Sequence, residues 1–367
     1  MKKIIVITIL IISLIFLNSC KINEEQNESK TCQEQNEEIC YNHQVCDGSI
    51  LTSTNTNRCC LGDCKLPKSF NWRDRHNENW MTPVKNQGNN DACYSFAIIG
   101  AIEAHINLYY NQHLDVDLAE QFLEDCINCC SPGDTKSIQE FFLPNACENN
   151  DCGSMARNFC RFKEHGIILE ECDPYSMLYR GKCTYKNICS DWQNKNWKIN
   201  DYEIYVINNL GEIGESGSNC QYNDLTNENE FKKILIENGP IATGLNYMNH
   251  AMVLSGYETN KNGQTMWIFK NSRGLDDEEN GYKTVTDRID PKENRYVIDE
   301  INPGIIPLGP YVSPTGESYD ILCVDKDNDN FCNWGITEVK PSTCPQECEF
   351  ERDWDDSDSN TGALGLY

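Results

Sequence analysis

Basic residues are scarce in this sequence of 367 residues, in which 31 lysines and arginines stand against 57 aspartates and glutamates. The resulting formal net charge of −26 disfavours nucleic acid as a partner, because neutralising phosphates requires a basic face. Only six histidines are present, and their scattered positions lack the spacing of zinc fingers. The acidity instead suits a soluble extracellular protein and is compatible with calcium binding. No internal repeat spans a whole domain.

Long apolar runs are also missing, apart from one at the N-terminus. Lys2 and Lys3 precede an apolar run from Ile4 to Leu17, which is too short for a membrane span and typical of a signal peptide. The run ends in a Leu-Asn-Ser-Cys string that resembles the bacterial lipoprotein box, in which the cysteine receives a lipid. We therefore expect a signal peptide at 1–19 and an exported, cell-surface or extracellular protein anchored to the membrane through Cys20. Ordinary cleavage nearby, with Cys20 unmodified, is the alternative.

Cysteine, by contrast, is abundant, and 22 cysteines in an exported chain predict disulfides rather than free thiols. Setting aside Cys20 for the lipid and Cys93 for the chemistry discussed below leaves an even number. The remainder also divides evenly by region, which supports the two assignments without proving them, and the connectivity stays open. The groups are Cys32, Cys40, Cys46, Cys59, Cys60 and Cys64; Cys126, Cys129, Cys130, Cys147, Cys152, Cys160, Cys172, Cys183, Cys189 and Cys220; and Cys323, Cys332, Cys344 and Cys348.

Composition divides the mature chain into four regions. A polar tether at 20–31 leads into a cysteine-rich minidomain at 32–65, which is too short to bury a core without disulfides. The main domain spans 66–313, and an Asp- and Cys-rich tail occupies 321–358.

The main domain contains patterns of both kinds of secondary structure. Apolar residues at helical spacing predict a buried helix at 91–111, with Asp91 as its N-cap and Cys93 in its first turn. A second, short helix is expected at 117–126. Helices first and strands later indicate an α+β arrangement with segregated lobes. The predicted strands are 241–245, 252–254 and 266–269.

Cys93 is the candidate nucleophile. Peptide hydrolysis by a thiol needs a thiolate, a base that shares its proton, a group that orients the base, and donors for the oxyanion. A cysteine in the first turn of a helix lies at the positive end of the helix dipole, which favours the thiolate. A buried half-cystine is the competing interpretation, and the odd cysteine count outside Cys20 disfavours it.

Three further features accompany Cys93, and together they resemble the active-site motifs of papain-like cysteine peptidases. The similar segments are 82–88 with 93–97, 249–253, and 270–274. The resemblance implies that Cys93 attacks, that His250 is its base and that Asn271 orients the imidazole. It also implies that Gln87, six residues before Cys93, and the Cys93 backbone N–H stabilise the oxyanion. A lone histidine is more often structural and an Asn-Ser-x-Gly string is often only a turn, but four elements in the family's order outweigh both priors.

The resemblance covers roughly Leu66 to Pro307. It implies an α+β, papain-like two-lobed fold, with a helical lobe and a β-barrel-like lobe, flanked by small disulfide-rich segments. It further implies a disulfide between Cys126 and Cys183. A peptide or protein would be the substrate, catalysis would need no cofactor, and we expect a monomer. The implied substrate-binding residues are Gly153, Met155 and Ala251.

The sequence departs from the family at several positions. Arg273 stands where a tryptophan usually shields the histidine–asparagine pair, and an arginine there would weaken that hydrogen bond or repel the imidazolium, lowering the pKa of His250. We expect activity in spite of it. The family's usual disulfide before the nucleophile is missing, with Asn90 and Asn150 at its two positions. The stretch from Leu245 to His250 is short, so we expect a cleft that is more open on one side.

The tail carries acidic residues at alternating positions, as calcium loops do. Asn330 replaces the usual glycine and no glutamate occupies the twelfth position, so this is not a standard EF-hand. The tail resembles the Asp-rich, cysteine-stapled calcium repeats of bacterial and archaeal surface proteins, whereas a solvated acidic tail is the alternative. The predicted calcium ligands are Asp325, Asp327, Asp329, Asp355 and Asp358.

The sequence therefore favours an exported cysteine peptidase that hydrolyses peptide bonds through a Cys-His-Asn site. One alternative is a catalytically impaired papain-fold surface protein acting in binding or adhesion, which Arg273 would support. Another is a calcium-dependent structural module in which the peptidase fold is only a spacer. The segment 20–65 is too short for the family's helical inhibitory propeptide, so latency would rest on the cysteine-rich minidomain or be absent.

Overall fold

The structure, a computed structural model, is described here for most of the chain beyond residue 29. The described residues are 30–41, 43–51, 53–54, 56, 58–124, 153–177, 188–192, 195–207, 223–245, 248–286, 301–313, 319–354 and 356–357. The predicted signal peptide and Cys20 lie outside them, as do Asn150 and the cysteines of the expected Cys126–Cys183 pair. Among the described helices, none combines the length and the apolarity that crossing a membrane requires.

The minidomain at 32–65 is a small knot of short strands held by three disulfides. All six of its cysteines pair with one another, as their even count predicted. Four of them are fully buried, so disulfides form most of the interior of a segment too small for an apolar core. One sheet has the order β1-β4-β3 and the other pairs β2 with β5. The elements are η1 (Gln33–Gln35), β1 (Glu38–Ile39), β2 (Val45–Cys46), β3 (Ser49–Leu51), β4 (Cys59–Leu61) and β5 (Cys64–Lys65).

The main domain contains an eight-stranded sheet with the path β10-β9-β15-β11-β12-β13-β14, and β6 pairs with β12 beside this path. Its pairs are antiparallel except β9 with β10. The strands predicted at 241–245, 252–254 and 266–269 are confirmed. The strands are β6 (Ser69–Asn71), β9 (Asp201–Ile207), β10 (Asn223–Leu225), β11 (Ile241–Leu245), β12 (His250–Thr259), β13 (Thr265–Lys270), β14 (Tyr282–Thr286) and β15 (Ile301–Leu308).

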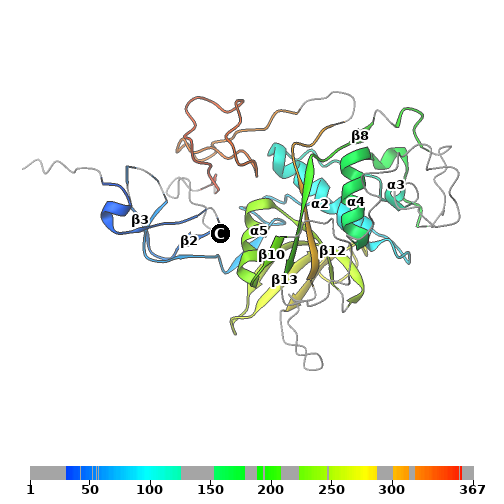
Figure 1. Cartoon of the computed structure of the whole chain (residues 1–367), viewed down its shortest axis with the longest axis horizontal. Helices are drawn as coiled ribbons and strands as arrows, with labels where there is room; N and C mark the ends of the chain where they lie inside the picture. The colour runs from blue at the N-terminus through cyan, green and yellow to red at the C-terminus, as the bar shows by residue number, and fades with distance from the viewer. Residues whose placement is uncertain are drawn as a thin grey trace, which may run out of the picture.

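Helices α2, α3 and α4 lie on one side of the main domain, whereas α5 lies beside the sheet near β10 (Figure 1). The helix predicted at 91–111 is confirmed as α2 (Cys93–Tyr110), but the predicted cap Asp91 is wrong. The N-cap is Ala92, which makes no side-chain cap bond because its methyl group cannot accept one. Asp91 lies one residue earlier, and its N–H donates to Asn90 Oδ1 at 3.0 Å. Of the helix predicted at 117–126, the described part contains α3 (Glu120–Phe122), and residues 125 and 126 lie outside the described residues. The remaining elements are α4 (Gly153–His165), β7 (Ile167–Ile168), η3 (Glu170–Cys172), β8 (Asn196–Trp197) and α5 (Glu228–Asn238).

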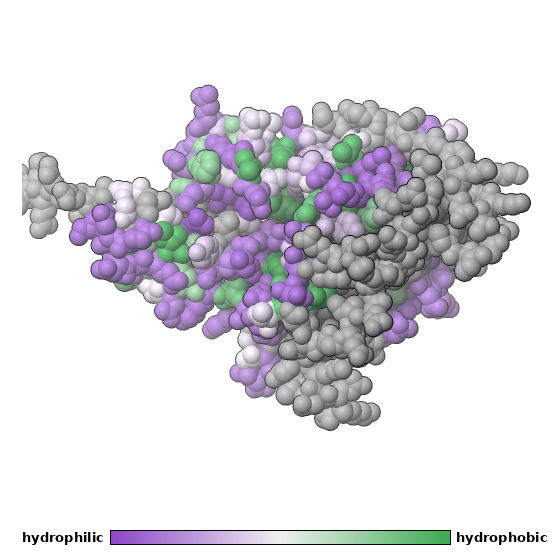
Figure 2. All heavy atoms as spheres, in the orientation of Figure 1, coloured by the Kyte–Doolittle hydropathy of each residue, from purple (hydrophilic) through white to green (hydrophobic). Residues whose placement is uncertain are grey.

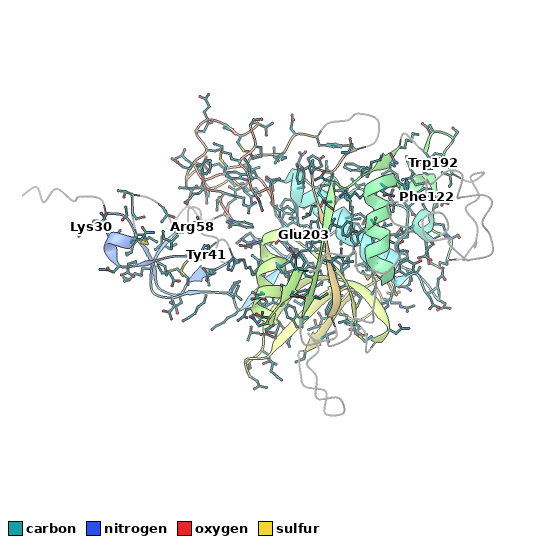
Figure 3. The ribbon with its side chains drawn as sticks, viewed as in Figure 1. Lys30, Tyr41, Arg58, Phe122, Trp192 and Glu203 are labelled. Atoms are coloured by element: carbon teal, nitrogen blue, oxygen red, sulfur yellow. A yellow bond between two sulfur atoms is a disulfide. The ribbon has the colours of Figure 1, made fainter. Side chains whose placement is uncertain are left out.

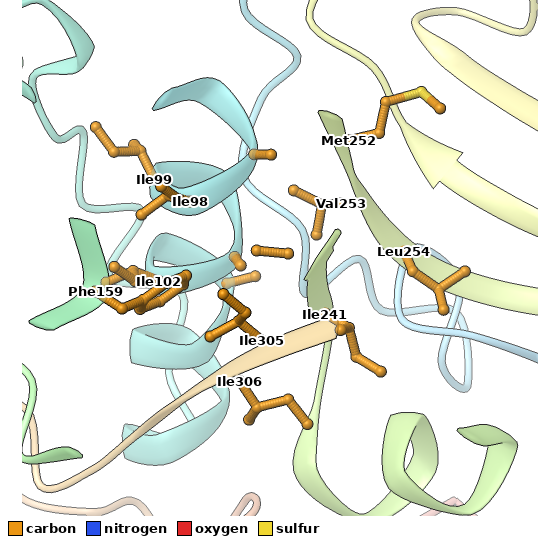
Figure 4. Packing of buried hydrophobic residues seen from close by; sticks show 14 of the residues in the cluster. Ile98, Ile99, Ile102, Phe159, Ile241, Met252, Val253, Leu254, Ile305 and Ile306 are labelled. Atoms are coloured by element: carbon orange, nitrogen blue, oxygen red, sulfur yellow. The ribbon is translucent and has the colours of Figure 1, made fainter. Parts of the chain in front are cut away.

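Helix α2 is buried on nearly all sides, which explains its broad apolar pattern. Figure 4 shows Ile98, Ile99 and Ile102 of α2 on the side of Phe159 from α4, with Val253 of the sheet across from them. A Cβ at position 100 would lie 3.2 Å from Val253 Cγ2, so the glycine there lets α2 approach β12 closely. The helix therefore joins the helical side to the sheet, and it carries Cys93 at its first position.

The tail at 319–357 folds around buried Trp334 and two disulfides, Cys323–Cys344 and Cys332–Cys348. It packs against the C-terminal end of α2. The Leu322 N–H donates to the Tyr110 carbonyl at 2.9 Å, and the Ile336 N–H donates to the Leu108 carbonyl at 3.2 Å. The tail thus satisfies carbonyls that the end of a helix leaves without helical partners.

Where its atoms are coloured, the face of the molecule drawn in Figure 2 is mainly hydrophilic, with scattered apolar spots.

Candidate active site

Cys93 is the first residue of α2, partly exposed, and the free cysteine among the described residues. The first N–H groups of a helix have no intrahelical partner and form the positive end of its dipole. A thiolate at this position is therefore stabilised, and the Cys93 N–H belongs to the set of available donors. The free thiol agrees with the cysteine count, which left Cys93 unpaired.

His250 and Asn271 are brought together by neighbouring strands. His250 is the first residue of β12, and Asn271 follows the last residue of β13. The distance from His250 Nε2 to Asn271 Oδ1 is 2.7 Å. Because an amide oxygen only accepts, the proton lies on Nε2 and leaves Nδ1 as the ring nitrogen available to a thiol.

Burial lowers the pKa of His250, and the nearby charges of Arg273 and Lys283 lower it further. The Asn271 hydrogen bond and the charge of Asp277 act in the opposite direction and favour the protonated ring. The expected lowering by Arg273 is thus present, but burial is the larger cause.

Gln87 is held rigidly in the loop before α2 and is only 1% exposed. Its backbone N–H donates to the Ser272 carbonyl at 2.8 Å, and its Oε1 accepts from Ser272 Oγ at 2.5 Å. One N–H of its amide is used by the Asn90 carbonyl, 2.5 Å from Nε2. An amide has two such donors, and the second is the one that the predicted oxyanion role would use. The loop before α2 is therefore held by hydrogen bonds to Ser272, the residue that follows Asn271.

Residues 66–300 match the family model described as papain family cysteine protease. The chain belongs to the papain family. The match covers more than half of the chain, and it corresponds closely to the region from Leu66 to Pro307 whose motifs resemble that family.

The chain is also similar to curated proteins named as cathepsins and cysteine proteases. A viral cathepsin of Cydia pomonella granulosis virus is 28% identical over 59% of this chain and 56% of its own length. The probable cysteine protease RDL5 of Arabidopsis thaliana is 31% identical over 65% of this chain and 58% of its own length. The chain thus spans less than two thirds of the length of these relatives.

Two solved structures also match part of the chain. The bromelain protease from Ananas comosus, in complex with the E64 inhibitor, matches with a TM-score of 0.42 and 20% identity, covering 66% of this chain and 99% of that one. The digestive procathepsin L 3 of the Tenebrio molitor larval midgut matches with a TM-score of 0.43 and 19% identity, covering 76% and 79%.

The papain-type site rests on a buried charge network that sequence reasoning missed. Lys85 Nζ lies 2.8 Å from Glu103, 2.6 Å from Asp117 and 2.9 Å from Glu120. Thr82 Oγ1 donates to Glu103 at 2.7 Å and accepts from buried Lys270 Nζ at 2.9 Å. Glu103, the single carboxylate in this mostly apolar helix, was the available signal. The network ties both ends of the site to α2, because Lys85 precedes Gln87 by two residues and the other lysine precedes Asn271.

The three residues predicted to bind substrate occupy different places. Ala251 follows His250 on β12, is 6% exposed, and lines a small cavity with Phe96 of α2. Met155 lies on α4, is 7% exposed, and packs in the main core. Gly153 is the first residue of α4. Ala251 is therefore the predicted binding residue that lines a cavity together with a residue near the start of α2.

Arg273 does more than repel the imidazolium. Its exposed side chain donates from Nη1 to the Gly88 carbonyl at 2.7 Å, and its backbone forms a bridge with Asn86. It thus fastens the oxyanion loop to the asparagine segment. This contact joins two loops that are far apart in the sequence, and no local pattern signals it.

The acidic residues of the tail come together from two segments. Carboxylates of Asp325, Asp327 and Asp356 form one trio, and those of Asp327, Asp329 and Asp353 form another; within each trio the ligand atoms lie within 4.8 Å of one another. Asp353 and Asp356 are buried, with 1% and 7% exposure. Sequence reasoning missed these two, although they belong to the acidic run that prompted the prediction. The other predicted ligands, residues 355 and 358, lie outside the described residues.

Proposed function

We propose that this papain-family protein is a cysteine peptidase. The observation that carries the proposal is the 2.7 Å hydrogen bond between His250 Nε2 and Asn271 Oδ1, because it presents Nδ1 as the base for a thiol. Cys93 at the start of α2 is the nucleophile, and the exported setting and a peptide or protein substrate follow from the same assignment. We expect the protein to be a monomer that a lipid on Cys20 anchors to the membrane.

The reaction begins when His250 Nδ1 takes the thiol proton of Cys93, which leaves a thiolate and an imidazolium. The sulfur attacks the carbonyl carbon of the scissile peptide bond, and the resulting oxyanion accepts hydrogen bonds from the free Gln87 N–H and the Cys93 backbone N–H. The imidazolium then protonates the departing amine, and the C–N bond breaks to leave a thioester. Water, deprotonated by the neutral imidazole, attacks the thioester and releases the carboxylic acid and the thiol.

The test is labelling of the mature, oxidised protein with an epoxide inhibitor that alkylates papain-type thiolates. We expect one inhibitor per chain by intact mass, and peptide mapping that places it on Cys93. Cys93→Ala controls for other thiols, and His250→Ala should slow labelling because the thiolate loses its cationic partner. A folded protein that takes up no inhibitor and cleaves no peptide would support the impaired surface protein that acts in binding or adhesion.

We also propose that the tail binds calcium. What supports this is the meeting of five carboxylates in two trios that share Asp327, two members of which are buried. Burying like charges together is costly unless a cation compensates them, and hard oxygen ligands suit calcium. Asp325, Asp327, Asp329, Asp353 and Asp356 are the residues that would hold it.

Calcium titration of the full mature chain tests this second proposal. We expect heat of binding by calorimetry and a melting temperature raised by several degrees over that in a chelator, since a ligand that binds only the folded state stabilises it. Asp327→Asn should lose both effects. Asp320→Asn, in an exposed position of the same tail, is the matched control. Equal melting temperatures in calcium and in chelator would favour the solvated acidic tail.

A further inference from the structure

Asn271 makes a second side-chain hydrogen bond that the Cys-His-Asn description leaves unused. Its Nδ2 donates to Asp277 Oδ2 at 2.6 Å. Asp277 lies in the turn between β13 and β14, and this turn folds back on the site because the Asn271 N–H donates to the Gly281 carbonyl at 2.9 Å and the Gly281 N–H donates to the Asp277 carbonyl at 2.7 Å.

The shape of this turn is set by Gly281. The residue has a φ of 81°, and a Cβ there would lie 2.5 Å from Val84 Cγ1, so that neither the backbone conformation nor the space suits a side chain. The turn therefore returns along one path, which places the Asp277 carboxylate beside the Asn271 amide. The backbone of the turn therefore brings Asp277 close to Asn271, and its short side chain completes the contact.

The two ends of the Asn271 amide face chemically different partners. Oδ1 lies 2.7 Å from His250 Nε2 and accepts from the Ser272 N–H at 2.8 Å. Nδ2 faces Asp277, and an ionised carboxylate only accepts. A reversed amide would put its oxygen against the carboxylate and its N–H groups against His250 Nε2, which would favour the wrong tautomer of the ring.

We propose that Asp277 is a positioning residue that fixes the orientation of the Asn271 amide and stabilises the imidazolium of His250 with its charge. The inference rests on the proposed peptidase function, and it extends the site to a chain of four residues, Cys93, His250, Asn271 and Asp277. Asp277 touches neither substrate nor nucleophile and acts through Asn271.

The charges around His250 are consistent with this role. Arg273 from the asparagine segment and Lys283 from β14 disfavour a positive ring, as burial does, and all three lower the pKa of His250. Asp277 raises that pKa and so opposes them. The thiolate of Cys93, on α2, is the remaining charged group of the ion pair. Asp277 is thus the fixed negative charge that offsets the two cations when the thiolate has been consumed in the acyl-enzyme.

The experiment compares Asp277→Asn with Asp276→Asn, which removes the same charge from the adjacent, exposed position. For Asp277→Asn we expect the alkaline limb of kcat/KM to move to lower pH by about one unit, kcat to fall several-fold, and KM to stay unchanged. Asp276→Asn should behave like the wild type. Asp277→Ser, which keeps an acceptor for Asn271 but no charge, is the second variant should Asp277→Asn fold poorly.

A readout independent of turnover separates this proposal from the proposed function. Nitrogen-15 NMR of His250 in the Cys93→Ala background reports the tautomer and the pKa of the ring without any catalysis. We expect Nε2–H in the parent, with a lower pKa and a mixed tautomer once Asp277 is neutral. Identical titrations and tautomers for the Asp277 and Asp276 variants would overturn the positioning role. Absence of labelling and hydrolysis in the wild type, with these NMR shifts present, would overturn the peptidase function alone.

Discussion

Some side chains of the candidate site both hold the local structure and have a predicted catalytic role, and Gln87 is the clearest example. One N–H of its amide holds the loop through the Asn90 carbonyl, and its oxygen accepts from Ser272. These two hydrogen bonds fix the orientation of the amide, and its remaining N–H is the predicted oxyanion donor. Such preorganised donors contribute more to catalysis than donors that must first be ordered.

Gln87→Ala is expected to lower kcat by about 10²- to 10³-fold with little change in KM, because it removes one oxyanion donor. Steady-state kinetics on a fluorogenic peptide provide the measurement. Gln87→Glu is the matched control, since it keeps the size and the acceptor for Ser272 but removes the donors, and it should be at least as impaired. Retention of more than half of the wild-type kcat by Gln87→Ala would contradict the assigned role.

Arg273 has two opposing effects. Its charge lowers the pKa of His250, and its side chain holds the loop before α2 through the Gly88 carbonyl. Substitutions can separate the charge from the contact. Arg273→Gln removes the cation that lowers the pKa of His250 but keeps a donor for the Gly88 carbonyl. We expect its alkaline limb of kcat/KM to move to higher pH, opposite to that of Asp277→Asn, because the imidazolium survives to higher pH. A pH series of kcat/KM measures this. Arg273→Trp tests the second effect, and much lower activity in it would show that the loop contact outweighs the repulsion.

At the level of elements, helix α2 makes contacts with other parts of the structure along its whole length. Its N-terminus carries Cys93, its middle carries the buried Glu103 of the charge network, and its C-terminus meets the tail. Buried His105 also lies on it, with Nε2 2.7 Å from the Pro240 carbonyl. A helix with so many fixed partners holds the nucleophile still relative to β12, which begins with His250.

His105 makes the stability of the protein depend on pH. Burial lowers the pKa of His105 to about 4, from an ordinary value of 6.5. Between these values the unfolded chain binds the proton and the folded chain does not, so stability is present above pH 6.5 and is lost as the pH falls, by about 3 kcal/mol in total at pH 4. Urea unfolding between pH 8 and pH 4 measures this slope, and His105→Gln should flatten it. An equally steep slope in the variant would assign the effect to other groups.

What could be predicted from the sequence follows from how local each signal is. The helix at 93–110 was predictable because burial on all sides leaves a continuous apolar pattern. Cys93, His250 and Asn271 could be proposed from the sequence because each stands in a short motif, and their catalytic roles stay predictions. Asp277 was not, because its role depends on a turn that folds back through Gly281. The Lys85 network was missed for the same reason, since its partners come from separate segments and only their arrangement in space reveals the cluster.

At the scale of the whole molecule, the papain-type domain lies between two disulfide modules that are both fastened to it. The tail seals the end of α2, where Gly335 approaches so closely that a Cβ would lie 1.9 Å from the Leu108 carbonyl. The knot contacts α5 through His43 and Glu237, whose atoms Nδ1 and Oε1 are 2.7 Å apart, and it contacts the tail through Arg58. Both modules therefore brace the domain from its surface.

The position of the knot, the minidomain at 32–65, indicates whether it can inhibit the enzyme. Figure 3 places Tyr41 and Arg58 of the knot at one end of the molecule, and Phe122 and Trp192 of the helical side at the other. The hydrogen bonds described between the knot and the rest of the chain go to Glu237 and to the tail, and none of these partners belongs to the site. A segment that inhibits a thiol peptidase has to occupy the cleft beside the nucleophile, and the knot contacts other surfaces.

We therefore expect the mature chain to be active with its knot attached. Intact mass after epoxide treatment should show full labelling of Cys93 without prior proteolysis, at a rate that removal of the knot by limited cleavage near Leu66 does not change. Glu237→Ala, which releases the contact with His43, should leave that rate unaltered while lowering the melting temperature, because the knot loses a brace but the cleft gains no space. Labelling that begins only after cleavage, or that accelerates in Glu237→Ala, would contradict this expectation. It would show that the knot is the inhibitory segment and that its contact with α5 keeps the enzyme inhibited.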